Sequence, residues 1–205
     1  MKYLVGFRRQ AVQWSSMLLS VFVLLLSTGC FYNIRFEDIG YSIEQKKFDA
    51  GLVAVITPQT VAQGKQIQSL MAGPAYTWEA RPGEMLLQIA EVEFPQMFQY
   101  YRTAIEYQEP KEGDKRLIVE LLAQHYDFSD FHATVVVQAK TYHPGHVLIF
   151  DKSYREEGDT QGSKMFWGGA FAMKSAIRQS SFDAYKKVFA KLRADLVNVL
   201  EKPSP

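Results

Sequence analysis

The strongest constraint on the fold is an alternation of apolar and polar side chains within residues 117–154. The apolar positions of 117–123 and of 133–139 recur at every second residue, which is the period of a β-strand with one buried face. Pro144 and Gly145 can occupy the centre of the following turn, because glycine accepts a positive φ. Residues 147–154 form the predicted third strand after this turn, so the sequence predicts an antiparallel meander of three strands.

The last part of the domain has a different period. Residues 170–200 carry apolar side chains at helical spacing, with most of the basic residues on the other side. An amphipathic helix of this kind must bury its apolar face, and the meander supplies a surface for it. The predicted stripe consists of Ile177, Ala184, Val188, Leu192, Leu196 and Val199.

The middle of the chain is less regular. The apolar run 51–56 predicts a first strand. Residues 57–82 are rich in proline and glycine, which indicates a long loop, with a helical turn near 66–71. A helix follows over 82–92, with Pro82 in its first turn; Pro95 predicts its end or a kink.

A second strand is expected at 103–107, before the meander. The predicted order is therefore β-α-β-β-β-β-α. This is an α+β fold with a single mixed sheet, which contains the antiparallel meander and has its helices packed on one face.

Cys30 is the only cysteine in the 205 residues, so neither an internal disulfide nor a thiolate metal cluster can form. It follows a basic start, a 13-residue apolar run at 14–26 and three small residues. This pattern is typical of a secretion signal. The apolar run is shorter than the roughly 20 residues that span a bilayer, although an uncleaved signal anchor remains the alternative, because no charge occurs from 10 through 34.

The residues S-T-G-C at 27–30 resemble the lipobox of bacterial lipoproteins. Ser27 departs from the usual leucine, since Leu26 stands one position too early. The resemblance implies cleavage before Cys30 and covalent lipid, such as palmitate, on this residue. Two or more acyl chains anchor a protein stably in a membrane. In such lipoproteins an aspartate at the position of Phe31 would favour the inner membrane, so the resemblance points to the outer membrane and a domain facing the periplasm.

These expectations divide the chain into a signal peptide at 1–29, a lipidated tether at 30–49, one periplasmic α+β domain at 50–202 and a frayed tail at 203–205. The tether is aromatic enough that part of it can pack on the domain. Cleavage removes 29 of the 205 residues and three of the 23 basic ones, which leaves 20 basic against 22 acidic residues. A nearly balanced charge gives no reason to expect a nucleic-acid partner.

The segments A-T-V-V-V-Q-A-K and V-L-I-F-D-K-S-Y and the terminal helix cover roughly the last 90 residues. Together they resemble the YajG-like envelope lipoproteins, the auxiliary lipoproteins of ABC transporters and the amino-terminal domain of TolB. They resemble the LPS-assembly lipoprotein LptE more loosely. The resemblance implies a small envelope domain with an accessory role, but a fold does not fix a function.

Candidate residues for chemistry are few. His125, Asp127 and His132 could meet across one predicted turn and hold a zinc ion, although polar residues that cap exposed turns have the same pattern. The other two histidines flank the next turn, about 33 Å away at the rise of a strand. The sequence has no G-x-S-x-G nucleophile elbow.

The stretch M-F-W-G-G at 165–169 is too apolar for an ordinary solvated loop. It either completes the core or forms an exposed patch that docks on a partner or dips into the bilayer. Met165, Phe166 and Trp167 are therefore candidate partner-binding residues. Tyr76 and Trp78, in the long loop, form a second candidate contact surface.

The leading hypothesis is a lipid-anchored, non-enzymatic periplasmic protein. It would be an accessory of an envelope transport or assembly machine and bind a protein partner through the sheet edge and the 165–169 stretch. One alternative is a lipid-anchored metal-binding protein or hydrolase that uses the histidine cluster. Another is a carrier that holds a lipid or other apolar ligand between helix and sheet.

Overall fold

The structure is a computed structural model and describes residues 30–37, 39–44, 46–68, 76–107, 116–143 and 147–201. The predicted signal peptide, the frayed tail and the turn at Pro144-Gly145 lie outside these ranges. Within the described ranges, eight strands form two sheets, with five strands in the order β5-β2-β6-β7-β8 and three in the order β1-β4-β3. The large sheet consists of β2 (Phe48–Val55), β5 (Phe98–Ala104), β6 (Leu117–Ser129), β7 (His132–His143) and β8 (Val147–Glu157).

The predicted meander is confirmed, because β6, β7 and β8 pair antiparallel in sequence order. The turn between β6 and β7 is tight: Asp130 and Phe131 both have positive φ values, of 48° and 63°. Two positive φ values match the twist of a two-residue hairpin. β2 pairs parallel with both β5 and β6, which makes the sheet mixed.

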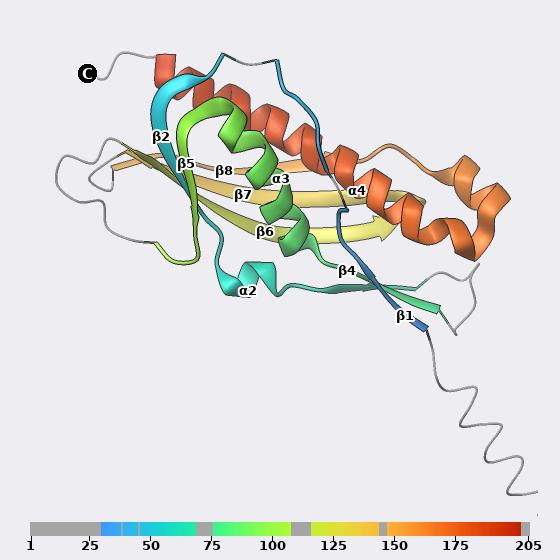
Figure 1. Cartoon of the computed structure of the whole chain (residues 1–205). Helices are drawn as coiled ribbons and strands as arrows, with labels where there is room; N and C mark the ends of the chain where they lie inside the picture. The colour runs from blue at the N-terminus through green and yellow to red at the C-terminus, as the bar shows by residue number, and fades with distance from the viewer. Residues whose placement is uncertain are drawn as a thin grey trace, which may run out of the picture.

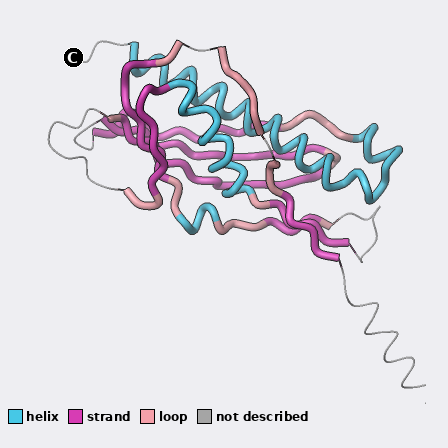
Figure 2. Tube along the Cα trace, viewed as in Figure 1, coloured by secondary structure: helices cyan, strands magenta, loops and turns pink. Residues whose placement is uncertain are grey.

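Two long helices, α3 (Pro82–Met97) and α4 (Gly162–Glu201), cover the same face of the large sheet (Figure 1; Figure 2). The apolar stripe predicted for the last helix is buried, except that Val199 is half-buried. Two buried serines fix α4 to the sheet: Ser180 accepts a hydrogen bond from the Ala133 amide, and Ser181 pairs with the Tyr126 hydroxyl, both at 2.8 Å. Buried polar groups need such partners, so these bonds set the position of the helix.

The smaller sheet was missed by the sequence analysis. It consists of β1 (Cys30–Ile34), β3 (Lys65–Ile67) and β4 (Tyr76–Ala80), with β1 parallel to β4 and β3 antiparallel to it. The α+β class and the order β-α-β-β-β-β-α are confirmed for the large sheet. The single sheet that we expected is joined by this second one, because it pairs segments far apart in the sequence.

Two local predictions were wrong. Residues 65–67 form β3 instead of a helical turn, and the helix α2 (Pro58–Val61) lies earlier, where the Thr57 hydroxyl caps its first turn. The strand expected at 103–107 begins at Phe98, because Pro95 sits inside α3, close to its end, and does not stop the helix before Met97.

The segment 30–49 is also more than a tether. Cys30 is the first residue of β1, and Ile34 and Phe36 are buried in the main core. The Phe36 ring packs edge-to-face on Phe182 of α4, with 5.5 Å between ring centroids. Most of this segment is thus built into the domain.

Candidate functional site

The most exposed aromatic side chains of the described structure occur within six residues of the sequence at the start of α4. Phe166, Trp167 and Phe171 are 75%, 86% and 94% exposed. The rings of Phe166 and Trp167 contact each other edge-to-face, at 5.2 Å between centroids. Large exposed apolar groups that lie together mark interaction surfaces. We call these three residues the aromatic patch.

A break in α4 shapes this patch. Gly169 has φ 51° and ψ −137°, which is not helical, so a short helical segment and a long one meet there. Only glycine adopts this conformation without strain. Figure 1 shows the start of α4 (orange) turning sharply into the long helix. The segment that was expected to be a loop is therefore helical on both sides of one glycine.

Basic residues lie near the aromatic patch in the sequence. Residues 160–182 contain Lys164, Lys174 and Arg178 and no aspartate or glutamate. Lys174 and Arg178 both bind Glu37, at 3.2 Å and 2.6 Å. The hydrogen bond from Lys174 and the two positive charges lower the pKa of Glu37 below its usual value. These ion pairs connect α4 to the segment that follows β1.

The structure corrects two of the predicted partner-binding residues. Trp78 is only 2% exposed and lies in the core, and Met165 is buried in the same core. Both fill space between the sheets and the helices, so neither can contact a partner. Phe166 and Trp167 point away from the core, as one of the two interpretations expected. Tyr76 begins β4, opposite Cys30 in the register, but its side chain lies outside the described structure.

Phe171 belongs to the patch, although we did not select it from the sequence. The signal was present: it is an aromatic residue two positions after a Gly-Gly pair, in a segment without acidic residues. Its exposure depends on the direction in which the long helix leaves Gly169, and the local sequence does not state that direction.

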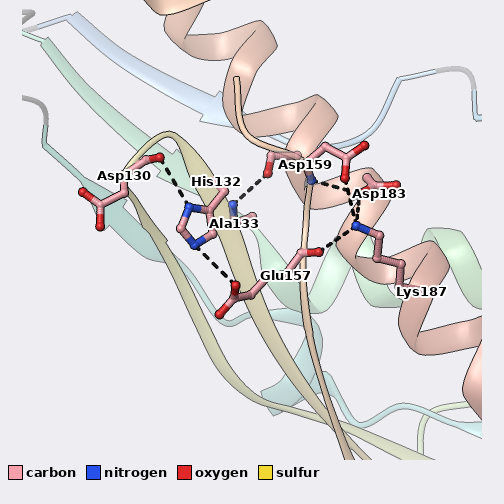
Figure 3. A network of polar contacts seen from close by, with 8 residues as sticks. Asp130, His132, Ala133, Glu157, Asp159, Asp183 and Lys187 are labelled. Atoms are coloured by element: carbon pink, nitrogen blue, oxygen red, sulfur yellow. Dashed lines mark hydrogen bonds and ion pairs between the residues drawn. The ribbon is translucent and has the colours of Figure 1, made fainter. Parts of the chain in front are cut away.

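The histidine cluster does not assemble. His132 lies 3.3 Å from the backbone oxygen of Asp130 and 3.8 Å from the Glu157 carboxylate (Figure 3). Asp127 instead faces Lys65, at 3.9 Å. His125 lies on the long β6 and pairs with Val136 of β7. It is four residues, or about 13 Å, before the hairpin end of β6.

The interpretation that His125, Asp127 and His132 meet across the turn was therefore wrong. A bulge between Ala123 and His125 shifts the register of β6, and the strand continues to Ser129. Within the described ranges no three histidine, cysteine, aspartate or glutamate side chains are grouped to hold a metal ion.

A charged network beside His132 fastens the β8–α4 connection (Figure 3). Lys187 binds Asp183 at 2.7 Å and Asp159 at 3.0 Å, and it donates to the Glu157 backbone oxygen at 3.0 Å. The hydrogen bonds to Asp183 and Asp159 raise the pKa of Lys187. The network fixes where α4 begins, so it helps to position the aromatic patch.

β8 is an edge strand of the large sheet and has eleven residues. Val147 and Leu148 are exposed at its start. On the inner side, Lys152 and the Tyr154 hydroxyl both donate to Asp195 of α4, at 2.7 Å. An edge strand presents unpaired backbone groups and can accept a further strand. β8 is therefore a second candidate interaction surface.

A pocket of about 220 Å³ lies where β6 continues past the end of β2. Its wall is mainly apolar, with Glu120 and Lys140 as its charged members. No local sequence pattern predicts this pocket, because its lining comes from four segments of the chain. The lining residues are Val55, Thr57, Thr60, Tyr107, Glu120, Leu121, Leu122, Gln138 and Lys140.

In the part of the chain that the structure describes, no helix is both long and apolar enough to cross a bilayer. No family model matches the chain, and no curated protein matches it. A crystal structure of an uncharacterized protein aligns with 72% of this chain and 97% of its own, at 12% identity and a TM-score of 0.37. The hypothetical protein CT253 from Chlamydia trachomatis aligns with 71% of this chain and 95% of its own, at 9% identity and a TM-score of 0.36. Both TM-scores are below 0.5.

Proposed function

We propose that the chain is a lipid-anchored periplasmic accessory protein of a cell-envelope transport or assembly machine, held in the outer membrane by lipid on Cys30. It binds a protein partner and carries out no catalysis. The lipobox-like residues before Cys30 support the anchor. The observation that carries the binding role is the open edge of β8, at the end of a five-stranded sheet.

The chemistry of β8 suits the addition of a partner strand. Apart from Tyr154, its side chains are exposed or half-buried. Lys152 and Tyr154 hold the strand against α4 through Asp195, so the edge is presented as a fixed template. Main-chain hydrogen bonds from an added strand supply affinity, and side-chain contacts supply specificity. Val147 and Leu148 are exposed apolar contacts for that strand.

The test is affinity purification of the full-length protein from gently solubilised envelopes. The wild type is compared with Cys30→Ala, with Leu148→Lys on β8, and with Tyr100→Lys on the opposite edge strand β5 as the matched control. One membrane complex should be recovered with the wild type and the control. It should be lost with Cys30→Ala, and also with Leu148→Lys, because a charge on the edge opposes strand addition.

Radiolabelled palmitate should label the wild type and leave Cys30→Ala unlabelled. Recovery of the protein alone in every case would remove the accessory role. Equal recovery with Leu148→Lys would move the partner away from the β8 edge. Both lysine variants change exposed side chains, so their melting temperatures should stay close to that of the wild type.

A second candidate function is a carrier for a small amphipathic ligand, and the pocket beside β6 favours it. A mainly apolar wall with one carboxylate and one ammonium group suits a molecule with both characters. Native mass spectrometry of the purified protein should then show a bound mass. Leu122→Trp, which fills the pocket from an exposed position, should remove that mass, whereas an unchanged spectrum would exclude this pocket as the carrier site.

A further inference from the structure

We propose that the aromatic patch of Phe166, Trp167 and Phe171 inserts into the surface of the bilayer that anchors Cys30. The start of α4 would then be a second, non-covalent membrane contact. This inference rests on the proposed lipid anchor, and it concerns a contact that the anchor by itself does not require.

The connection between the anchor and the patch is short. Cys30 is already the first residue of β1, so no free tether separates the acylated residue from the folded domain. Seven residues later, Glu37 binds Lys174 and Arg178 of α4. An extended chain of that length spans about 23 Å. The domain must therefore lie close to the bilayer surface.

The anchor also gives the domain a direction relative to the membrane. Figure 1 shows the beginning of β1 and the start of α4 at the same end of the molecule, with β5 at the opposite end. β1 and α4 also contact each other. A lipid chain on Cys30 pulls this end toward the membrane, so the aromatic patch is on the side that faces the bilayer.

The chemistry of the aromatic patch suits a membrane interface. Phenylalanine and tryptophan with lysine and arginine nearby are the side chains that settle at membrane interfaces. The aromatic patch combines these features: residues 160–182 contain three basic and no acidic residues, and with Glu37, which pairs with two of the three, the net charge is still 3 − 1 = +2. The phosphates of anionic phospholipids attract such a segment. A protein partner would not need the patch to lie beside the anchor, so these observations favour the bilayer.

The patch is also rigidly presented. Met165 of the same short helical segment is buried in the core, and Lys164 donates a hydrogen bond to Gln179 of the long helix. The aromatic rings therefore need little ordering when they enter the interface. Burying each of them strengthens membrane partition by about tenfold or more, and this adds to the hold of the acyl chains on Cys30.

The experiment uses the full chain, produced in bacteria and reconstituted into vesicles of phosphatidylethanolamine and phosphatidylglycerol. Some vesicles contain lipids brominated near the carbonyl end of the acyl chain and others lipids brominated near the methyl end. Bromine quenches tryptophan that enters the bilayer. Trp167 is exposed, whereas Trp78 is 2% exposed and acts as an internal reference. The difference between the wild type and Trp167→Phe isolates the emission of Trp167.

We expect Trp167 emission to shift to shorter wavelength and to be quenched more by the shallow bromines than by the deep ones. Phe166→Ser/Phe171→Ser, which keeps the reporter, should lose most of this quenching. Tyr100→Ser, an exposed aromatic of β5 at the opposite end, should retain it. Replacing phosphatidylglycerol by a zwitterionic lipid should weaken it.

Mass spectrometry of the same preparation reads the acylation of Cys30 separately. An acylated protein whose Trp167 is not quenched overturns the inference and leaves the anchor intact; the patch is then free to bind a protein. A protein without acylation whose Trp167 is still quenched supports the insertion of the patch and removes the anchor. Equal quenching in Phe166→Ser/Phe171→Ser and the wild type also overturns the role of the patch.

Discussion

Arg193 of α4 donates a hydrogen bond of 2.8 Å to the carboxylate of Glu93 on α3, which is only 2% exposed. The Tyr41 hydroxyl donates to the same carboxylate at 2.7 Å. Burial, and next the hydrogen bond to Glu93, raise the pKa of Tyr41 well above its ordinary value. The buried Glu93 carboxylate, which accepts hydrogen bonds from Arg193 and Tyr41, thus joins both helices to the segment after β1.

Arg193→Ala should destabilise the protein by about 3 kcal/mol or more, because it leaves the Glu93 charge buried without its cation. The double variant Arg193→Ala/Glu93→Gln should recover part of this loss, since the amide is neutral. Chemical denaturation of the two single variants and the double variant measures the coupling. Additive losses would contradict a direct interaction.

Met165 and Trp167 are two positions apart, and their substitutions should have opposite outcomes. Met165→Ala creates a cavity in the core and should cost about 2–4 kcal/mol. Trp167→Ala removes an exposed ring and should change the free energy of unfolding by about 0.5 kcal/mol or less. Thermal denaturation of the two variants and the wild type measures this difference in stability. A collapse in the melting temperature of Trp167→Ala would show that the ring is part of the core.

Gly169→Ala should cost about 1–3 kcal/mol, because a side chain at φ 51° and ψ −137° is strained. Gly40→Ala is the matched control: a Cβ built there meets no atom within 4 Å. This control should be neutral or slightly stabilising. If the two variants have the same melting temperature, the break in α4 does not depend on Gly169.

The acid limit of stability should depend in part on Asp195. Burial raises its pKa, but hydrogen bonds from Lys152 and Tyr154 outweigh burial and lower the pKa below the ordinary value of 3.8. The stabilisation is therefore complete above pH 3.8 and is lost as the pH falls through the lower pKa of the folded state.

Asp195→Asn should consequently cost about 1 kcal/mol at pH 7, a value reduced by solvent screening. The difference from the wild type should shrink as the pH drops below 3.8. Melting curves across this range test the prediction, with the exposed Asp49→Asn as control. A gap between wild type and Asp195→Asn that stays constant down to low pH would argue against the Lys152 and Tyr154 contacts.

Much of the fold could be predicted from local patterns. The period-two runs of β6 and β7 and the helical stripe of α4 each state which side of the element is apolar, so the meander and the covering helix follow. The second sheet could not be predicted in this way. It pairs Cys30 with Tyr76 and Ile34 with Ala80, and short segments so far apart carry no shared period.

The candidate sites, too, could be predicted from the sequence only where a local pattern marks them. Sequence alone singled out the apolar 165–169 stretch, because an apolar segment before a helix is unusual. Whether each ring is covered depends on distant segments. Trp78 is buried while Trp167 is exposed, although both were candidates for the surface. The pocket beside β6 needed four segments to come together.

The amino-acid sequence by itself therefore determined the α+β class, the order of the elements along the chain, the antiparallel meander and the amphipathic last helix. These properties follow from side-chain periodicity within single elements. Only the tertiary structure decided that Cys30 begins a strand, that the histidine cluster is dispersed and that the aromatic patch faces outward. The first two depend on the register of paired strands, and the third depends on the direction in which the chain leaves Gly169. Contacts between distant residues set both.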